Sequence, residues 1–286
     1  MLYDLIMLSD PGYFGPDSMM WKVNKEITVL FGGARALLMH AAHPLIAAGA
    51  RQTSFYQRDP WKRLIRTLSL QNSVTFGTKE EADDSAHRIN KLHEVINGND
   101  EITGGYYDAL NHEQLLWVHA CLQISSIYFY EKTVRKLTES QKNQYHLENM
   151  KSADLVLVDI EKMPKTHDGL KEWVIEKSQE KDYLRYTDVA KDVQDIIAGG
   201  PVPKHIKPIW PFIAFTAFNT LPKEFKNIYG IKDTKLKSFI LEFNLKFLKY
   251  SRPFLPPFFR LIAPARWAKQ RITKKPDLRF SDKAKF

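Results

Sequence analysis

The histidine best placed to do chemistry in this 286-residue chain is His93. If segment 82–96 is helical, apolar side chains recur every three or four residues, and His93 falls on that stripe with Ala82 and Ala86. The other histidine of the segment, His87, falls on the polar face. A buried imidazole must hydrogen-bond both ring nitrogens or ligate something with one of them. The pattern therefore suits an axial ligand to a flat cofactor, and a hydrogen-bonded core histidine is the alternative.

Two further histidines lie in apolar surroundings. His43 precedes Pro44 near the end of one apolar run, and His119 lies in the middle of another. Each is expected either to face the same cofactor or to bond a nearby backbone group, as buried polar side chains commonly do.

Arginines in the first 70 residues have few acidic neighbours along the chain. Arg35, Arg63 and Arg66 belong to this group, and no Asp or Glu occurs between Glu26 and Asp59. A buried guanidinium without a carboxylate favours an anionic ligand, such as a phosphate or an acidic cofactor group. A solvated helix face is the alternative for Arg63 and Arg66.

Several common catalytic and metal motifs are missing from the sequence. It contains no Walker-type glycine loop, no G-x-S-x-G elbow and no H-E-x-x-H motif. Its one cysteine, Cys121, excludes a zinc site built from several thiolates.

Local helix signals recur along the chain and predict an all-α fold. Residue pairs suited to helix N-termini occur at Asp59–Pro60, Thr78/Glu81, Asn111/Gln114 and Thr138/Gln141. The Gly32–Gly33 pair is expected to interrupt a helix that begins near Asp17 or Ser18, or to allow close approach of a neighbouring helix. Pro44 is expected to end or kink a second helix that starts at Ala34. No alternating apolar pattern supports a sheet. We therefore expect a single multi-helix domain around a buried cofactor pocket, with a proline-rich C-terminal helical segment.

The longest apolar stretch, residues 27–50, contains Arg35, His40 and His43, so a buried helix is favoured over a membrane span. The N-terminal residues lack the features of a signal peptide. One cysteine is typical of a reducing compartment. We expect a cytoplasmic protein.

The net charge of +9 is concentrated at the C-terminus. Residues 246–286 hold 12 Lys or Arg against 2 Asp or Glu, which leaves the remainder at −1. We therefore divide the chain into a helical domain, 1–245, and a basic, aromatic tail, 246–286. The tail either contacts an anionic membrane surface or wraps over the domain. Because the domain itself is nearly neutral, no nucleic-acid partner is expected.

The order of five motifs resembles a known family. The motifs are the run Gly32–Gly49, Asp59-Pro-Trp-Lys-Arg63 with Arg66-Thr67, Val74-Thr-Phe-Gly77, Leu92-His-Glu-Val-Ile-Asn-Gly98 and Leu116-Trp-Val-His119. Over roughly residues 20–240 this series resembles the family of rubber oxygenases (latex-clearing proteins) and fungal MpaB-type oxygenases. Each motif alone is unspecific, whereas their shared order is fairly specific.

The resemblance implies an all-helical fold around a b-type haem, and cleavage of a carbon–carbon double bond with dioxygen. It places the axial iron ligand at His93, and the arginine and threonine of the family's R-x-x-K-T stretch at Arg63 and Thr67. Arg66 stands where rubber oxygenases have lysine, which keeps a cation but not one that readily releases a proton. Rubber oxygenases also use a glutamate base upstream of this stretch, and the acid-free segment here offers no counterpart.

We therefore expect a haem-dependent oxygenase or related oxidoreductase that acts with dioxygen on a hydrophobic, unsaturated small molecule or lipid. His93 would ligate the haem iron. His43, His119 and Arg35 would contact the cofactor, and the catalytic groups would be Arg63, Arg66 and Thr67. One alternative is a haem or lipid carrier of the same fold. Another is a helical membrane-surface adaptor whose histidines are all structural.

Overall fold

The computed structural model describes residues 10–53, 55–274 and 278–279, and the predicted all-α class is confirmed. In chain order its elements are α1 (Met19–Asn24), a 3-10 turn η1 (Ile27–Leu30), α2 (Phe31–Ala41), α3 (Pro44–Thr53), α4 (Phe55–Arg58), α5 (Pro60–Phe76), α6 (Lys79–His93), β1 (Asn97–Asn99), β2 (Tyr106–Asp108), α7 (His112–Thr133), α8 (Glu139–Leu155), α9 (His167–Gln179), α10 (Asp188–Gly199), α11 (Trp210–Asn219), α12 (Lys223–Ile228), α13 (Lys235–Ser251), η2 (Arg252–Phe254), α14 (Pro257–Arg260) and α15 (Ala263–Thr273).

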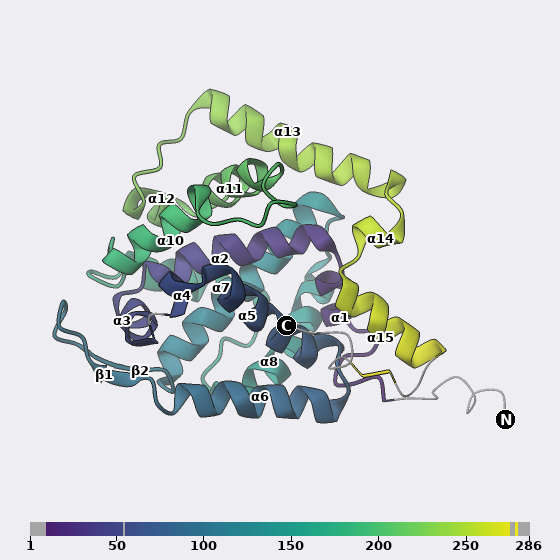
Figure 1. Cartoon of the computed structure of the whole chain (residues 1–286), viewed down its shortest axis with the longest axis horizontal. Coiled ribbons are helices and arrows are strands. Elements are labelled where there is room, and N and C mark those ends of the chain that lie inside the picture. The colour runs from purple at the N-terminus through teal and green to yellow at the C-terminus, as the bar shows by residue number, and fades with distance from the viewer. Residues whose placement is uncertain (1–9, 54, 275–277, 280–286) are drawn as a thin grey trace.

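The centre of the molecule is the packed pair α2 and α7, which the other helices surround (Figure 1). α7 is apolar nearly all round, so Trp117, Cys121 and Ile124 are buried in one large core cluster. Gly32 lies against the Ser125 backbone, where an added Cβ would come within 3.1 Å. The prediction that Gly32–Gly33 interrupts a helix is therefore wrong: the pair lies inside α2, and Gly32 permits close helix packing.

Pro44 ends the buried helix, as predicted. α2 stops at Ala41, α3 begins at Pro44, and the chain bends by 102° between the two. No single helix among the described residues is long and apolar enough to span a membrane. The bent pair formed by Ile27–Ala41 and Pro44–Thr53 reaches that length and apolar composition only when its two parts are counted together.

The helices α5 and α6 form an antiparallel hairpin with a two-residue connection. The Asp59 carboxylate accepts from the Lys62 N–H at the start of α5. Thr78 and Glu81 form a reciprocal capping box at the start of α6. Both predicted N-caps are confirmed, and so are those at Asn111 and Thr138.

A small sheet overturns the prediction that the chain contains no strands. β1 and β2 pair antiparallel, with Gly98 opposite Tyr107. The Asp100 carboxylate accepts from both the N–H and the hydroxyl of Thr103, which fixes the connecting turn. Strands of three residues are too short to give a periodic signal in the sequence.

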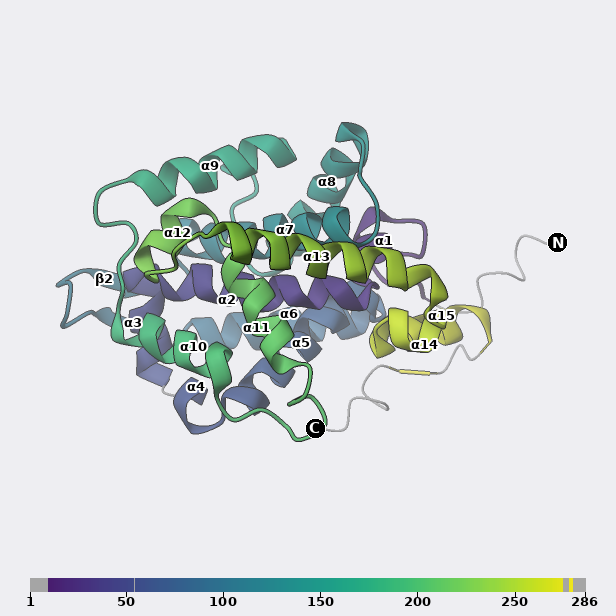
Figure 2. The ribbon, with the colours of Figure 1, turned by 90° about the horizontal axis from the view of Figure 1, so that it is seen from above.

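The C-terminal helices pack back onto the beginning of the chain (Figure 2). α15 packs on α5, and Ile262, Ala265 and Ile272 join Trp21 and Phe76 in a separate apolar cluster. The boundary placed at 245/246 falls inside α13. From residue 246 to Lys274 the basic segment is mostly helical and wraps over the domain.

Candidate functional site

The α5–α6 hairpin brings two of the predicted site residues to one end of the molecule. Arg63 lies in the first turn of α5, and His93 is the last residue of α6. Because the helices are antiparallel and joined by two residues, both positions lie at the open end of the hairpin.

His93 is half-buried, and its Nδ1 is buried without a hydrogen-bond partner among the described residues. Burial lowers the pKa of its imidazole, so the ring is neutral at pH 7. A neutral imidazole with an unpartnered nitrogen is the form that ligates metal ions. His93 therefore has a ring nitrogen available for a ligand, whereas His87 on the same helix is exposed, as predicted.

A histidine outside the predicted set, His40, lies near enough to Arg63 to be affected by its charge. The His40 Nε2 lies 3.0 Å from the Val118 carbonyl oxygen, as a hydrogen-bond donor would. Burial, with a smaller effect from the positive charge of Arg63, lowers its pKa to about 4, although the bond to Val118 opposes this shift. The hydrogen bond joins α2 to α7, and the side chain of Arg63 on α5 is near enough for its charge to act on His40. In the sequence, the only indication was that His40 belongs to the same apolar run as Arg35 and His43.

Arg66 and Thr67 lie on the solvent side of α5. Both side chains are exposed, while Arg63 is half-buried. The three residues share one face of α5, since they stand at i, i+3 and i+4, but only Arg63 is partly covered by the rest of the protein.

His119 faces α8 from the middle of α7. Its Nε2 is buried without a partner among the described residues. Burial lowers its pKa to about 4, and the Asn149 carbonyl of α8 partly opposes this effect. It is a second neutral histidine with an unpartnered ring nitrogen, and His167 at the start of α9 is a third.

His43 has a structural role at the break between α2 and α3. Its Nδ1 accepts from the Ile46 N–H at 3.5 Å, which caps the first turn of α3. Its ring centroid lies 4.7 Å from that of Tyr183 and 6.0 Å from that of Trp117. A hydrogen bond to a nearby backbone group was one of the two roles expected for His43, and the bond to Ile46 is of that kind.

Arg35 is buried with neutral partners supplied by the protein. It donates to the Thr220 carbonyl at 3.0 Å and to the Ser125 hydroxyl at 2.6 Å, and it lies over the Tyr128 ring. Burial lowers its pKa to about 10, so it stays charged at pH 7. These contacts meet the needs of the guanidinium without the anionic ligand expected from sequence.

Arg51 shows why the acid-free segment was misleading. Its guanidinium pairs with Asp100, at the hairpin turn, and with Asp188, at the start of α10. The carboxylates that were missing nearby in sequence come from distant parts of the chain. Among the described residues, no group of three His, Cys, Asp or Glu side chains is arranged to hold a metal ion.

Comparison with known proteins gives one match. The family model described as "ER-bound oxygenase mpaB/B'/Rubber oxygenase, catalytic domain" matches residues 21–249, which is most of the chain. No curated protein and no solved structure matches. The matched range contains α2, the α5–α6 hairpin and α7, and thus every predicted site residue. The chain therefore belongs to the family of mpaB/B' and rubber oxygenase catalytic domains.

Proposed function

We propose that this protein is a haem b-dependent oxygenase that acts with dioxygen on a hydrophobic, unsaturated substrate. The observation that carries the proposal is the buried, unpartnered Nδ1 of His93 at the end of α6, in a chain that belongs to an oxygenase family. A polar atom left unpaired in the interior costs about 1–3 kcal/mol, so it points to a ligand.

His93 would hold the haem iron. Its lowered pKa keeps the ring neutral, and it therefore loses no proton on ligation. The bound haem would supply the redox chemistry with dioxygen. The Asn90 amide of α6, which donates to the Leu155 carbonyl at 3.0 Å, ties the helix that carries His93 to α8.

Arg63 would be the main polar group on the substrate side. Arginine stays protonated at neutral pH, so it stabilises negative charge that develops on dioxygen without moving a proton itself. His40 stays neutral beside it and donates to Val118, so it adds no second positive charge. Arg66 and Thr67 would act beside Arg63 on the same helix, where both side chains are exposed.

One structural feature keeps a haem or lipid carrier as a second candidate. The two acidic residues nearest upstream of Arg63 are already engaged: Asp59 caps α5, and Glu26 is buried in a bidentate pair with Arg252. Neither is placed to serve as the upstream base that rubber oxygenases use. A reaction in this chain would therefore have to proceed without that base.

Oxygen uptake by the haemin-reconstituted protein distinguishes the two candidates. An oxygenase consumes dioxygen at the rate at which an added unsaturated isoprenoid or fatty acid is lost. We expect Arg63→Ala to slow oxygen consumption by roughly 10²-fold, because the substitution removes an electrostatic stabiliser. Lys62→Ala, the exposed neighbour, is the matched control. If the protein binds haem but no lipid of an unsaturated panel stimulates its oxygen consumption, the result would contradict an oxygenase function and support a carrier function.

A further inference from the structure

One face of α13 is apolar and exposed over its whole length. The exposed side chains recur every three or four residues, so they share a face. They are Leu236, Phe239, Ile240, Phe243, Phe247 and Tyr250. The opposite side of the helix packs on α7 and α11, where Asn244 and Leu245 are buried. A patch of this length is larger than the scattered apolar residues of an ordinary surface.

Exposed aromatic side chains also follow α13 along the chain. Phe254 is 87% exposed, and Phe258 and Phe259 of α14 are 62% and 60% exposed. In Figure 2, α13 crosses the foreground and α14 lies near its C-terminal end. We call the exposed residues of α13, η2 and α14 the aromatic face.

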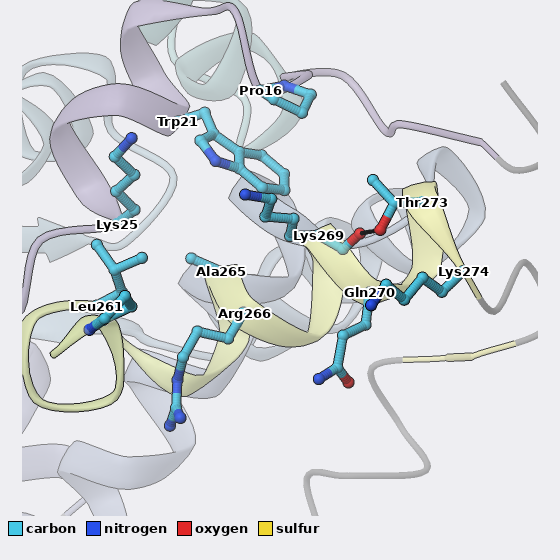
Figure 3. Close-up of a pocket in the computed structure, with 11 residues that line it drawn as sticks. Pro16, Trp21, Lys25, Leu261, Ala265, Arg266, Lys269, Gln270, Thr273 and Lys274 are labelled. Carbon is cyan, nitrogen blue, oxygen red and sulfur yellow. Dashed lines mark hydrogen bonds between the residues drawn. The ribbon is translucent and has the colours of Figure 1, made fainter. Parts of the chain in front are cut away.

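A basic pocket of about 550 Å³ lies next to α14. It opens between α1 and α15, with the Trp21 indole along one wall (Figure 3). Four cations line it, namely Lys25, Arg266, Lys269 and Lys274, and no acidic residue is among its lining.

The pocket is electropositive inside as well as at its rim. Burial lowers the pKa of Lys25, and the positive charges of Arg252, Arg260 and Lys269 lower it further, against the opposing effect of Glu26. The Nε atoms of Arg260 and Arg266 are buried without a hydrogen-bond partner among the described residues. Like charges gathered with unpartnered donors favour an anion.

The pocket and the aromatic face are continuous. The Arg266 guanidinium lies over the Phe258 ring, 4.2 Å from its centroid, and Pro257 and Leu261 at the ends of α14 line the pocket. We propose that this protein docks on the surface of a bilayer that contains anionic lipids, with the aromatic face in the acyl boundary and a lipid phosphate in the basic pocket.

The charges beside the aromatic face favour a bilayer over a second copy of this chain. Glu242 is the one acidic residue from Lys235 to Lys274, and it pairs with Lys246. A symmetric dimer through this surface would set lysines of one copy against those of the other. Anionic headgroups complement both the lysines and the pocket, and aromatic side chains with flanking lysines are typical of interfacial helices.

The proposal does not rest on haem or on oxygenase chemistry. Its test is co-sedimentation of the full chain with phosphatidylcholine vesicles, with and without phosphatidylserine. We expect strong binding to the anionic vesicles alone. Lys269→Gln with Lys274→Gln lowers binding roughly 25-fold, about fivefold for each charge. Phe243→Ser with Phe247→Ser abolishes it.

Matched controls lie on other faces. The exposed pair Lys171→Gln with Lys181→Gln, and the exposed Leu147→Ser of α8, leave vesicle binding unchanged. Circular dichroism confirms that each variant is folded. Hydrogen exchange of the wild-type chain slows in α13 and α14 when anionic vesicles are added.

Three results would overturn the proposal. The first is that the wild-type chain does not bind anionic vesicles, or that the Lys269→Gln, Lys274→Gln variant binds them as tightly as the wild type does. The second is that inorganic phosphate binds in calorimetry while vesicles do not, which would assign the pocket to a soluble anion. The third is a dimer in ultracentrifugation that the phenylalanine variant dissociates.

Discussion

At the scale of single residues, Arg35 is a buried charge whose hydrogen-bond partners among the described residues are all neutral. It is buried between α2, α7 and the end of α11, and its contacts are a carbonyl, a hydroxyl and an aromatic face. Removal of this side chain leaves those groups without a partner in the interior.

We predict that Arg35→Gln lowers the free energy of unfolding by about 3 kcal/mol, because buried charged hydrogen bonds are lost and their acceptors stay buried. Urea denaturation measures the change. Lys191→Gln, which removes an exposed ion pair on α10, changes stability by at most about 0.5 kcal/mol. Equal effects of the two substitutions would disprove this role of Arg35.

The sequence predicted some residues well and others poorly, for a physical reason. The position of His93 on an apolar stripe follows from helical spacing, and the structure places it half-buried with an unpartnered nitrogen. The partners of Arg51 lie 49 and 137 residues away, so no local pattern could reveal them. We expected buried arginines to bind an anionic ligand because no carboxylate lay near them in sequence. For Arg35 and Arg51 the expectation failed, because residues distant in sequence supply their hydrogen-bond partners.

At the scale of elements, the helix starts were predictable because capping is local. Each predicted cap forms a side chain-to-backbone bond within three residues. The small sheet was missed, and so was the continuation of α2 through Gly32–Gly33, although close helix packing was one of the roles expected for these glycines. The first is too short to show periodicity, and the second depends on close packing against α7.

The capping box of α6 gives a prediction about the hairpin that carries His93. Thr78→Ala removes the acceptor of the Glu81 N–H and should cost about 1 kcal/mol in thermal or urea unfolding. Thr78→Ser retains the hydroxyl and should stay close to wild type. If both substitutions are neutral, the hairpin does not depend on its cap.

A buried ion pair between Glu26 and Arg252 helps to hold the C-terminal wrap on the domain. Glu26 is 2% exposed and accepts two hydrogen bonds from Arg252, at 2.7 and 2.9 Å. Glu26→Gln leaves the guanidinium poorly paired and should lower stability by about 3 kcal/mol. We expect hydrogen exchange to accelerate from Arg252 to Thr273, with α8 unchanged. Uniform acceleration over both segments would contradict a role specific to the wrap.

At the scale of the whole molecule, buried histidines link stability to pH. Burial lowers the pKa values of His40, His43, His119 and His167 to about 4, from an ordinary value near 6.5. Between these values the unfolded chain binds protons that the folded chain does not. The stability is therefore complete above pH 6.5 and is lost as the pH falls toward 4.

Urea titrations from pH 7 to 4.5 measure this loss. Each histidine contributes a slope of at most about 1.4 kcal/mol per pH unit. His167→Gln removes one titrating group and should flatten the curve by about that amount. A stability that stays constant over this range would show that the histidines are accessible to protons in the folded state.

The packing of distant segments against one another was harder to predict from sequence than the helices or the individual site residues. The Glu26–Arg252 pair joins residues 226 positions apart, and the exposed face of α13 becomes visible only once its other side is packed. The basic character of the C-terminus was readable from sequence. Its helical packing against α1 and α5 was one of two open alternatives, because charge alone does not fix a tertiary position.

The measurement that tests haem ligation by His93 most directly is an absorption spectrum of the protein expressed with haem precursor, before and after dithionite. The wild-type chain should show a Soret band with full haem content, and so should His87→Ala, which alters the exposed histidine of the same helix. His93→Ala should lose or shift the band. A wild-type protein that takes up no haemin, or a His93→Ala variant with the wild-type spectrum, would contradict the assignment.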